Sequence, residues 1–75
     1  MMINLDTLYK EFGKKVKIER IKHELSQEKL AELAGLHRTT IGQIENGKAS
    51  PTLDSVARIA NALNLTLPEV VNLNF

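Results

Sequence analysis

The feature that most constrains this chain is a pair of short helices separated by a glycine-containing turn near its middle. Ser26 can accept a hydrogen bond from an unpaired backbone N–H at a helix start, and Gly35 can adopt the positive φ that ends the helix. Another short helix is predicted over about residues 38–45. Helices of this length are marginal alone in water, so packing against the rest of the chain must stabilise both. A turn of three or four residues that contains glycine gives such helices a steep crossing angle, and the whole unit is predicted at about residues 26–46.

The sequence on either side of this unit predicts three more helices. A long first helix covers about residues 6–24, and two apolar stripes along it lead us to expect that it is covered on two sides. A fourth helix follows Thr52 and reaches about residue 64, and a short fifth helix opens at Thr66 with Leu67 and Val70 directed inward. The two stripes are Leu5, Leu8, Phe12 and Val16, and Ile18, Ile21 and Leu25, while the fourth helix carries Leu53, Val56, Ile59, Ala60 and Leu63.

The predicted fold is therefore all-α, with five helices in a single domain that spans residues 1–75. A chain of this size buries only about 60% of its unfolded surface, which leaves no core for a second domain. No strand pattern interrupts the series of helices. One domain of this kind implies one main function.

Several classes of function are excluded by what the sequence lacks. There is no cysteine, and His23 and His37 do not have metal-ligand spacing, so we expect no metal and no other cofactor. We find no phosphate-binding loop or catalytic dyad, which argues against an enzyme. No apolar run approaches the roughly 20 residues that span a bilayer, and the N-terminus does not resemble a signal peptide. We therefore expect a cytoplasmic protein that does not bind membranes.

The outer face of the helix predicted over residues 38–45 carries side chains that can read bases. Ile41 and Ile44 lie one turn apart and are expected to face the core. Arginine can donate two hydrogen bonds to guanine, glutamine can pair with adenine, and threonine can contact thymine. Gly42 costs about 1 kcal/mol relative to alanine, which close approach to DNA could offset. We expect base contacts from Arg38, Thr39, Thr40 and Gln43, with one of the last three idle.

The same region resembles the Cro/C1-type (XRE-family) helix-turn-helix family over about residues 12–65. This family includes phage repressors, antitoxins and the controller proteins of restriction-modification systems. The resemblance implies a sequence-specific transcriptional regulator that places the helix starting at Arg38 in the major groove of DNA. The residues that carry it are Leu25-Ser26-Gln27-Glu28-Lys29-Leu30-Ala31, Ala34-Gly35-Leu36, Thr40-Ile41-Gly42-Gln43-Ile44-Glu45-Asn46-Gly47-Lys48 and Ser50-Pro51-Thr52-Leu53, and the segment 38–42 looks most like a controller protein.

The resemblance also implies contacts to the DNA backbone. Gln27 would lie at the start of its helix, near a phosphate and near the side chain of Arg38. Asn46 and Lys48 would contact phosphates from the loop after the recognition helix. Such contacts position a protein on the duplex without specifying the sequence.

Two further positions match the family pattern, and two others depart from it. Arg20 and Glu45 match a structural ion pair, which we expect to be largely buried. Glu19 departs from the family, in which leucine is common, and this affects how the first helix packs. Thr40 stands where controller proteins tend to have tyrosine, so the operator of that subgroup cannot be transferred to this chain.

The C-terminal segment, residues 66–75, is too apolar for an exposed tail. It either closes the core of the monomer or builds a dimer interface, and we expect both, with Val71, Leu73 and Phe75 in the interface. A single short recognition helix reads too few bases for tight specific binding. The sequence therefore predicts a homodimer on a palindromic operator.

The main alternative is an antitoxin-type protein-interaction module in which DNA binding is a secondary, autoregulatory activity. We see no toxin-binding extension beyond the domain, which favours the regulator. We also see no separate effector domain, so we expect no small-molecule effector. The operator sequence and the choice between repression and activation are not specified by these residues.

Overall fold

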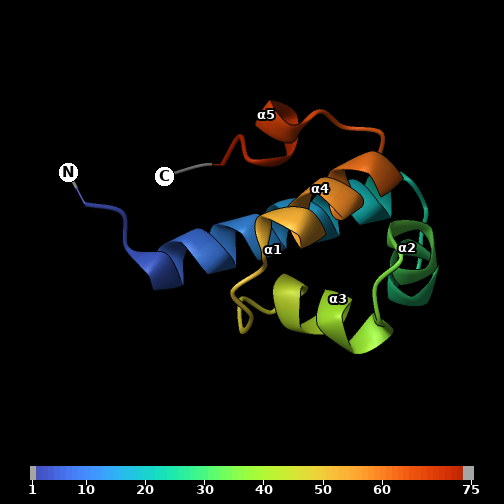
Figure 1. Cartoon of the computed structure of the whole chain (residues 1–75), viewed down its shortest axis with the longest axis horizontal. Coiled ribbons are helices and arrows are strands. Elements are labelled where there is room, and N and C mark those ends of the chain that lie inside the picture. Colours follow the sequence, from blue (N-terminus) through green and yellow to red (C-terminus); the bar gives the residue numbers. More distant parts are fainter. Residues whose placement is uncertain (1, 74–75) are drawn as a thin grey trace.

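The computed structural model describes residues 2–73, which form five helices (Figure 1). Within these residues there is no strand, so the predicted all-α fold of five helices is confirmed. The helices are α1 (Leu5–Lys22), α2 (Gln27–Ala34), α3 (Arg38–Glu45), α4 (Leu53–Ala62) and α5 (Leu67–Val70).

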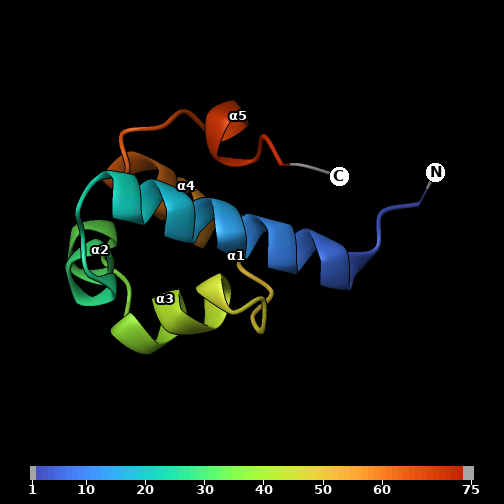
Figure 2. The same ribbon diagram turned by 180° about the vertical axis from the view of Figure 1, so that it is seen from behind.

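The long helix α1 separates α3 from α5. Figure 2 shows the molecule from behind, and in both views α3 lies on one side of α1 and α5 on the other. Helix α2 lies at one end, where it contacts both α3 and α4. Helices α3 and α5 therefore lie on opposite sides of the molecule.

A single apolar core holds these helices together. It is built from all five helices, and burying one such side chain stabilises the fold by about 1.5–3 kcal/mol. Because α2 and α3 are only eight residues long, this core fixes their positions. The side chains with less than 2% exposure are Val16, Leu30, Ile41, Ile44, Ile59, Leu63 and Val70.

Each helix begins at a side chain that accepts a backbone hydrogen bond. Ser26 and Thr52 accept from the N–H groups of Lys29 and Ser55, as the sequence indicates. Thr66 forms a reciprocal capping box with Glu69 at the start of α5. The starts of the helices are thus determined by local chemistry.

Two helices end earlier than the sequence predicts. Helix α1 stops at Lys22 rather than near residue 24, and α4 stops at Ala62 rather than near residue 64. The chain turns through a positive φ at Glu24 (56°) and Asn64 (57°). Glutamate rarely adopts this conformation, so nothing in the local sequence indicated the first of these turns.

Some predicted core positions are exposed. Helices α3 and α5 contact α1 on two sides, but Ile18 is 52% and Ile21 56% exposed, so the prediction that the second apolar stripe is covered is wrong for these two residues. Leu5 is 58% exposed because it lies in the first turn of α1. Leu67 is also exposed, since the four-residue α5 turns only Val70 toward the core.

Gly13 determines how closely α1 and α3 approach each other. A methyl group on Gly13 would collide with the carbonyl oxygen of Ile44 and lie 2.8 Å from that of Glu45. Glycine therefore allows the backbone of α1 to touch the last turn of α3. No local sequence pattern reveals this role, because the contact joins residues 31 positions apart.

Candidate nucleic-acid interface

The outer face of α3 is polar and lacks internal partners. Arg38, Thr39 and Gln43 are exposed, and Thr40 is half-buried. Within residues 2–73 none of these four side chains forms a hydrogen bond or an ion pair with the protein. Their donors and acceptors are therefore free to contact another molecule.

The turn before α3 fixes the direction in which this helix starts. Gly35 ends α2 with a φ of 68°, and the N–H of Leu36 donates to the carbonyl of Ala31 at 2.9 Å. His37 then caps α3, because its Nδ1 accepts from the N–H of Thr39 at 3.1 Å. This histidine has a structural role at the position where the recognition helix begins, and Arg38 follows it directly.

The far end of α3 is held by a buried ion pair. The Arg20 guanidinium donates from Nε and Nη2 to the two oxygens of Glu45, at 2.7 Å and 3.0 Å. The Glu45 side chain is only 1% exposed and that of Arg20 is 12% exposed. The hydrogen bonds to Glu45 raise the pKa of Arg20 above its ordinary value, so the guanidinium keeps its charge. Arg20 also donates to the carbonyl of Leu25 at 2.8 Å, which ties α1, the turn after it and α3 together.

Gln27 joins this network from the first turn of α2. Its Nε2 donates to Glu45 Oε1 at 3.1 Å, and no hydrogen bond links it to Arg38. Its Oε1 faces Gly42, where an added methyl group would lie at an ordinary 3.8 Å. The packing of the protein therefore leaves room for a side chain at position 42, and one N–H of the Gln27 amide remains available.

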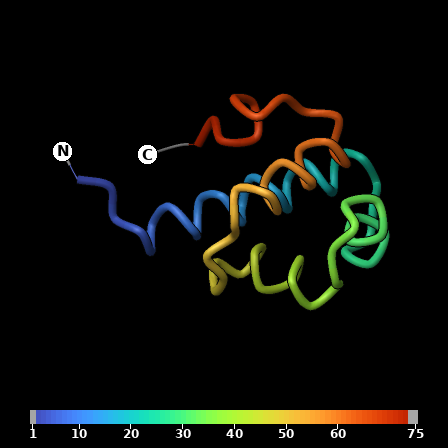
Figure 3. Tube along the Cα trace, viewed as in Figure 1, coloured from blue at the N-terminus to red at the C-terminus, as the bar shows by residue number. Residues whose placement is uncertain are grey.

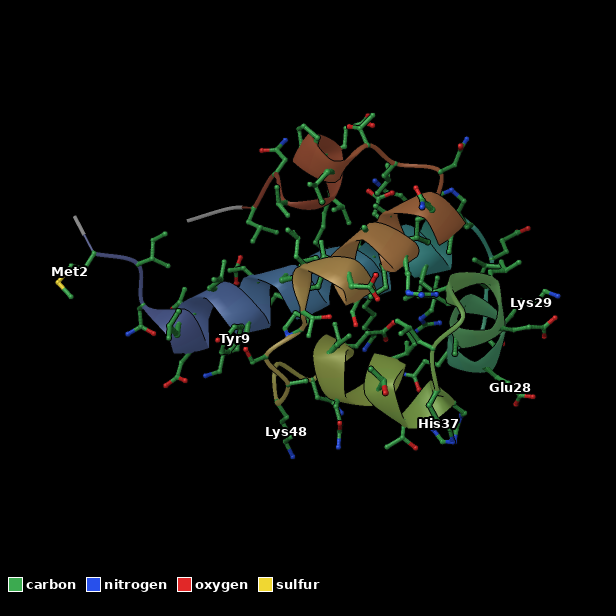
Figure 4. All side chains as sticks on the ribbon, in the orientation of Figure 1. Met2, Tyr9, Glu28, Lys29, His37 and Lys48 are labelled. Atoms are coloured by element: carbon green, nitrogen blue, oxygen red, sulfur yellow. The ribbon has the colours of Figure 1, made fainter. Side chains whose placement is uncertain are left out.

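The loop after α3 places two more candidate contact residues at the surface. Asn46 caps the end of α3, and both Asn46 and Lys48 are exposed. The N–H of Lys48 donates to the carbonyl of Gln43 at 2.9 Å. Figure 4 shows the Lys48 side chain pointing away from the body of the molecule, on the side of α3.

One contact to this loop was not predicted from the sequence. The hydroxyl of Tyr9 on α1 and that of Ser50 share a hydrogen bond of 2.9 Å. Figure 3 shows how the chain between α3 and α4 returns to the first half of α1. No local pattern connects residues 41 positions apart, so only the tertiary structure reveals this contact.

The residues predicted for the dimer interface lie on the opposite side. Val71 is 47% exposed, Leu73 is half-buried, and Phe75 lies outside the described residues. Val71 and Leu73 border an open groove of about 350 Å³ between the two ends of the described chain. The residues that line this groove are Ile3, Leu8, Tyr9, Phe12, Pro51, Val56, Val71 and Leu73.

Residues 2–73 offer neither a metal-binding cluster nor a membrane-spanning helix. No group of three or more histidine or acidic side chains could hold a metal ion there. No helix in this range is both long and apolar enough to cross a membrane. The polar face of α3 and the apolar groove are two candidate functional surfaces of these residues.

A family model described as helix-turn-helix (HTH_3) matches residues 16–70, which is more than half of the chain. Control protein C.SmaI of Serratia marcescens is 45% identical over 49 residues, which are 65% of this chain and 58% of that protein. Control protein C.BamHI of Bacillus amyloliquefaciens is 46% identical over 55 residues, which are 72% of this chain and 68% of that protein. The chain thus spans less than two thirds of the Serratia protein.

The fold is also similar to that of a solved structure. The restriction-modification controller protein C.AhdI from Aeromonas hydrophila is 34% identical to this chain, with a TM-score of 0.81. The match covers 83% of this chain and 94% of that protein. Sequence and structure therefore point to the same group of relatives.

Proposed function

The chain belongs to the helix-turn-helix (HTH_3) family of DNA-binding transcriptional regulators, and on this premise we propose that it reads a specific sequence of double-stranded DNA. In this proposal α3 enters the major groove, and a homodimer binds a palindromic operator with two half-sites. The base edges are contacted by Arg38, Thr39, Thr40 and Gln43, and the phosphates by Gln27, Asn46 and Lys48.

The observation that carries this proposal is a polar face without internal partners on a helix that is fixed at both ends. The His37 cap and the left-handed Gly35 hold the start of α3, and the buried Arg20–Glu45 pair holds its end. Side chains on a helix that is already ordered lose less conformational entropy on binding than those on a mobile segment. Such a helix is suited to present Arg38 to the edge of a guanine.

The homodimer is supported by the apolar surface on the other side of the molecule. Val71 and the groove beside it expose side chains that a second copy could cover. In a two-fold dimer the same residues meet across the axis, and the two recognition helices lie about 34–36 Å apart, which is one turn of DNA. Dimerisation is then coupled to DNA binding, and the binding curve becomes sigmoidal in protein concentration.

Selection of bound sequences from a random DNA pool tests the proposal directly. We expect the full chain to enrich a sequence with two half-sites whose centres are about 10–10.5 base pairs apart. Binding to that sequence should exceed binding to random duplex by about a thousandfold or more. Equal affinity for selected and random DNA would refute specific recognition.

The same measurement separates the regulator from the antitoxin-type alternative. A pure protein-interaction module should show no specificity ratio. In that case the free face of α3 would have to bind a protein, and substitution of Arg38 would leave DNA binding unchanged. A high ratio that depends on Arg38 supports the regulator.

A further inference from the structure

The basic side chains of this protein fall into two groups. Six of the ten form ion pairs with glutamate or aspartate within the chain, namely Lys14, Lys15, Arg20, Lys22, Lys29 and Arg58. The other four form no ion pair within residues 2–73, and they are Lys10, Lys17, Arg38 and Lys48. Arg38 and Lys48 belong to the DNA-binding face already described. A cation without an internal partner is available to an external anion, and Lys10 is such a cation close to the DNA-binding face.

Lys10 packs directly against the loop that follows α3. A methyl group on Gly47 would lie 2.9 Å from Lys10 Cγ and 3.1 Å from its Cα, so the two backbones are in close contact. Gly47 itself adopts a φ of 70°, and its neighbours Asn46 and Lys48 are both exposed. The alkyl stem of Lys10 therefore lies beside the residues proposed to bind phosphate.

Other contacts fix the position of this part of α1 relative to the loop. Tyr9, the preceding residue, shares its hydrogen bond with Ser50, and Figure 4 shows Tyr9 on α1 close to the loop that carries Lys48. Asp6 is four residues before Lys10 on α1, yet the two do not form an ion pair. Lys10 is exposed, and its Cα and Cγ lie against Gly47, so its side chain starts beside the loop.

We propose that Lys10 binds a DNA phosphate, so that the first turns of α1 extend the backbone contact made by Asn46 and Lys48. This inference rests on the proposed function and adds a residue to it. Lys10 precedes residue 16, where the match to the family begins, so no family pattern assigns it a role. The ligand is a phosphodiester next to the one bound by Lys48, and the contact adds affinity without sequence preference.

The test compares two lysines one turn apart on α1. Lys10→Gln removes the charge but keeps most of the stem that packs on Gly47, whereas Lys14→Gln removes a lysine that is paired with Glu11 at 3.3 Å. Affinities for the selected operator and for random duplex are measured between about 50 and 200 mM salt. We expect Lys10→Gln to weaken binding to both DNAs by the same factor and to reduce the salt slope by about 0.9 for each subunit bound, with Lys14→Gln unchanged. The thermal midpoint of both variants should equal that of the unsubstituted chain.

Replacement of single phosphates by uncharged methylphosphonates locates the contact. One replacement should weaken binding of the unsubstituted chain and have no effect on Lys10→Gln. The inference is overturned if the Lys10→Gln slope is unchanged, if Lys14→Gln lowers it equally, or if every methylphosphonate affects both proteins alike. An unchanged slope with specific binding that requires Arg38 would refute the Lys10 contact alone. A lowered slope without any specificity ratio would refute sequence recognition and leave the phosphate contact standing.

Discussion

Helix α3 and the C-terminal segment, residues 67–73, lie on opposite sides of α1 and differ in what they leave exposed. At the end of α3 the Glu45 carboxylate has its hydrogen-bond partners within the protein, because it accepts three hydrogen bonds from Arg20 and Gln27. The exposed face of α3 is polar. The C-terminal segment buries Val70 in the core, packs Leu73 against it and leaves Val71 beside an apolar groove.

This difference indicates how each side can be used. A pre-ordered polar face recognises a charged, hydrogen-bonding ligand such as DNA, and it remains compatible with water when it is empty. An exposed apolar groove is stabilised by a partner that removes it from water. The first surface needs no second copy to be formed, whereas the proposed dimer would cover the second, and the following variants test this contrast.

The largest effect is expected at the buried ion pair. Glu45→Gln leaves the Arg20 charge without its partner, and removal of one member of a buried pair costs about 3–5 kcal/mol. Urea denaturation should therefore show a domain near unfolding. Glu32→Gln is the matched control, because the Lys29–Glu32 pair is exposed and worth about 0.3–0.5 kcal/mol. An unchanged midpoint for Glu45→Gln would show that the end of α3 is held by its apolar contacts alone.

A smaller effect, on binding rather than stability, is expected on the outer face of α3. Arg38→Ala should cost about 1–3 kcal/mol on the selected operator and relax the preference at one base pair. Lys48→Ala should weaken all sequences alike and reduce the salt slope by about one. Equal losses on operator and random DNA for Arg38→Ala would demote Arg38 to a backbone contact.

The proposed dimer interface is tested by placing a charged side chain beside the apolar groove. Val71→Asp should weaken self-association at least tenfold, which corresponds to about 1.4 kcal/mol, because a carboxylate would be buried in the interface. Sedimentation at tens of micromolar measures the loss, and Leu33→Asp, an exposed leucine on α2, is the control. A chain that is monomeric before substitution, and whose operator binding survives Val71→Asp, would exclude the dimer through this surface.

The smallest effect concerns the cap of α5. The hydrogen bonds from the backbone and side chain of Thr66 lower the pKa of Glu69 below its ordinary value of 4.5. The Glu69 carboxylate therefore stabilises the fold fully above its ordinary pKa of 4.5. This contribution to the free energy of unfolding is lost as the pH falls through the lowered pKa of the folded state. Unfolding of the parent chain and of Glu69→Gln, compared at several pH values from neutral into acid, should show a small difference that shrinks as the pH falls below 4.5. A difference that does not change with pH would show that the charge is not responsible.

The sequence predicted most of the recognition unit because its signals are local. The cap at Ser26, the left-handed Gly35 and the bounds of α3 all follow from side chains within a few residues. The ends of α1 and α4 were less well predicted, because a positive φ is rare for a glutamate such as Glu24 and only several-fold more common for an asparagine such as Asn64. The base-contacting and phosphate-contacting roles on this unit stay predictions until DNA is bound.

What the sequence determined by itself is the set of helices, their polar and apolar faces, and the resemblance that gives the chain its family. What only the tertiary structure decided is which distant residues touch. Gly13 against α3, Lys10 against Gly47 and Tyr9 with Ser50 each join segments more than 30 residues apart. The same holds for Ile18 and Ile21, whose apolar stripe does not show whether any helix will cover it. The physical reason is that the hydrogen bonds of a helix and its caps are made by residues close in the sequence. Close packing instead depends on segments that are distant in the sequence and adjacent only in the folded chain.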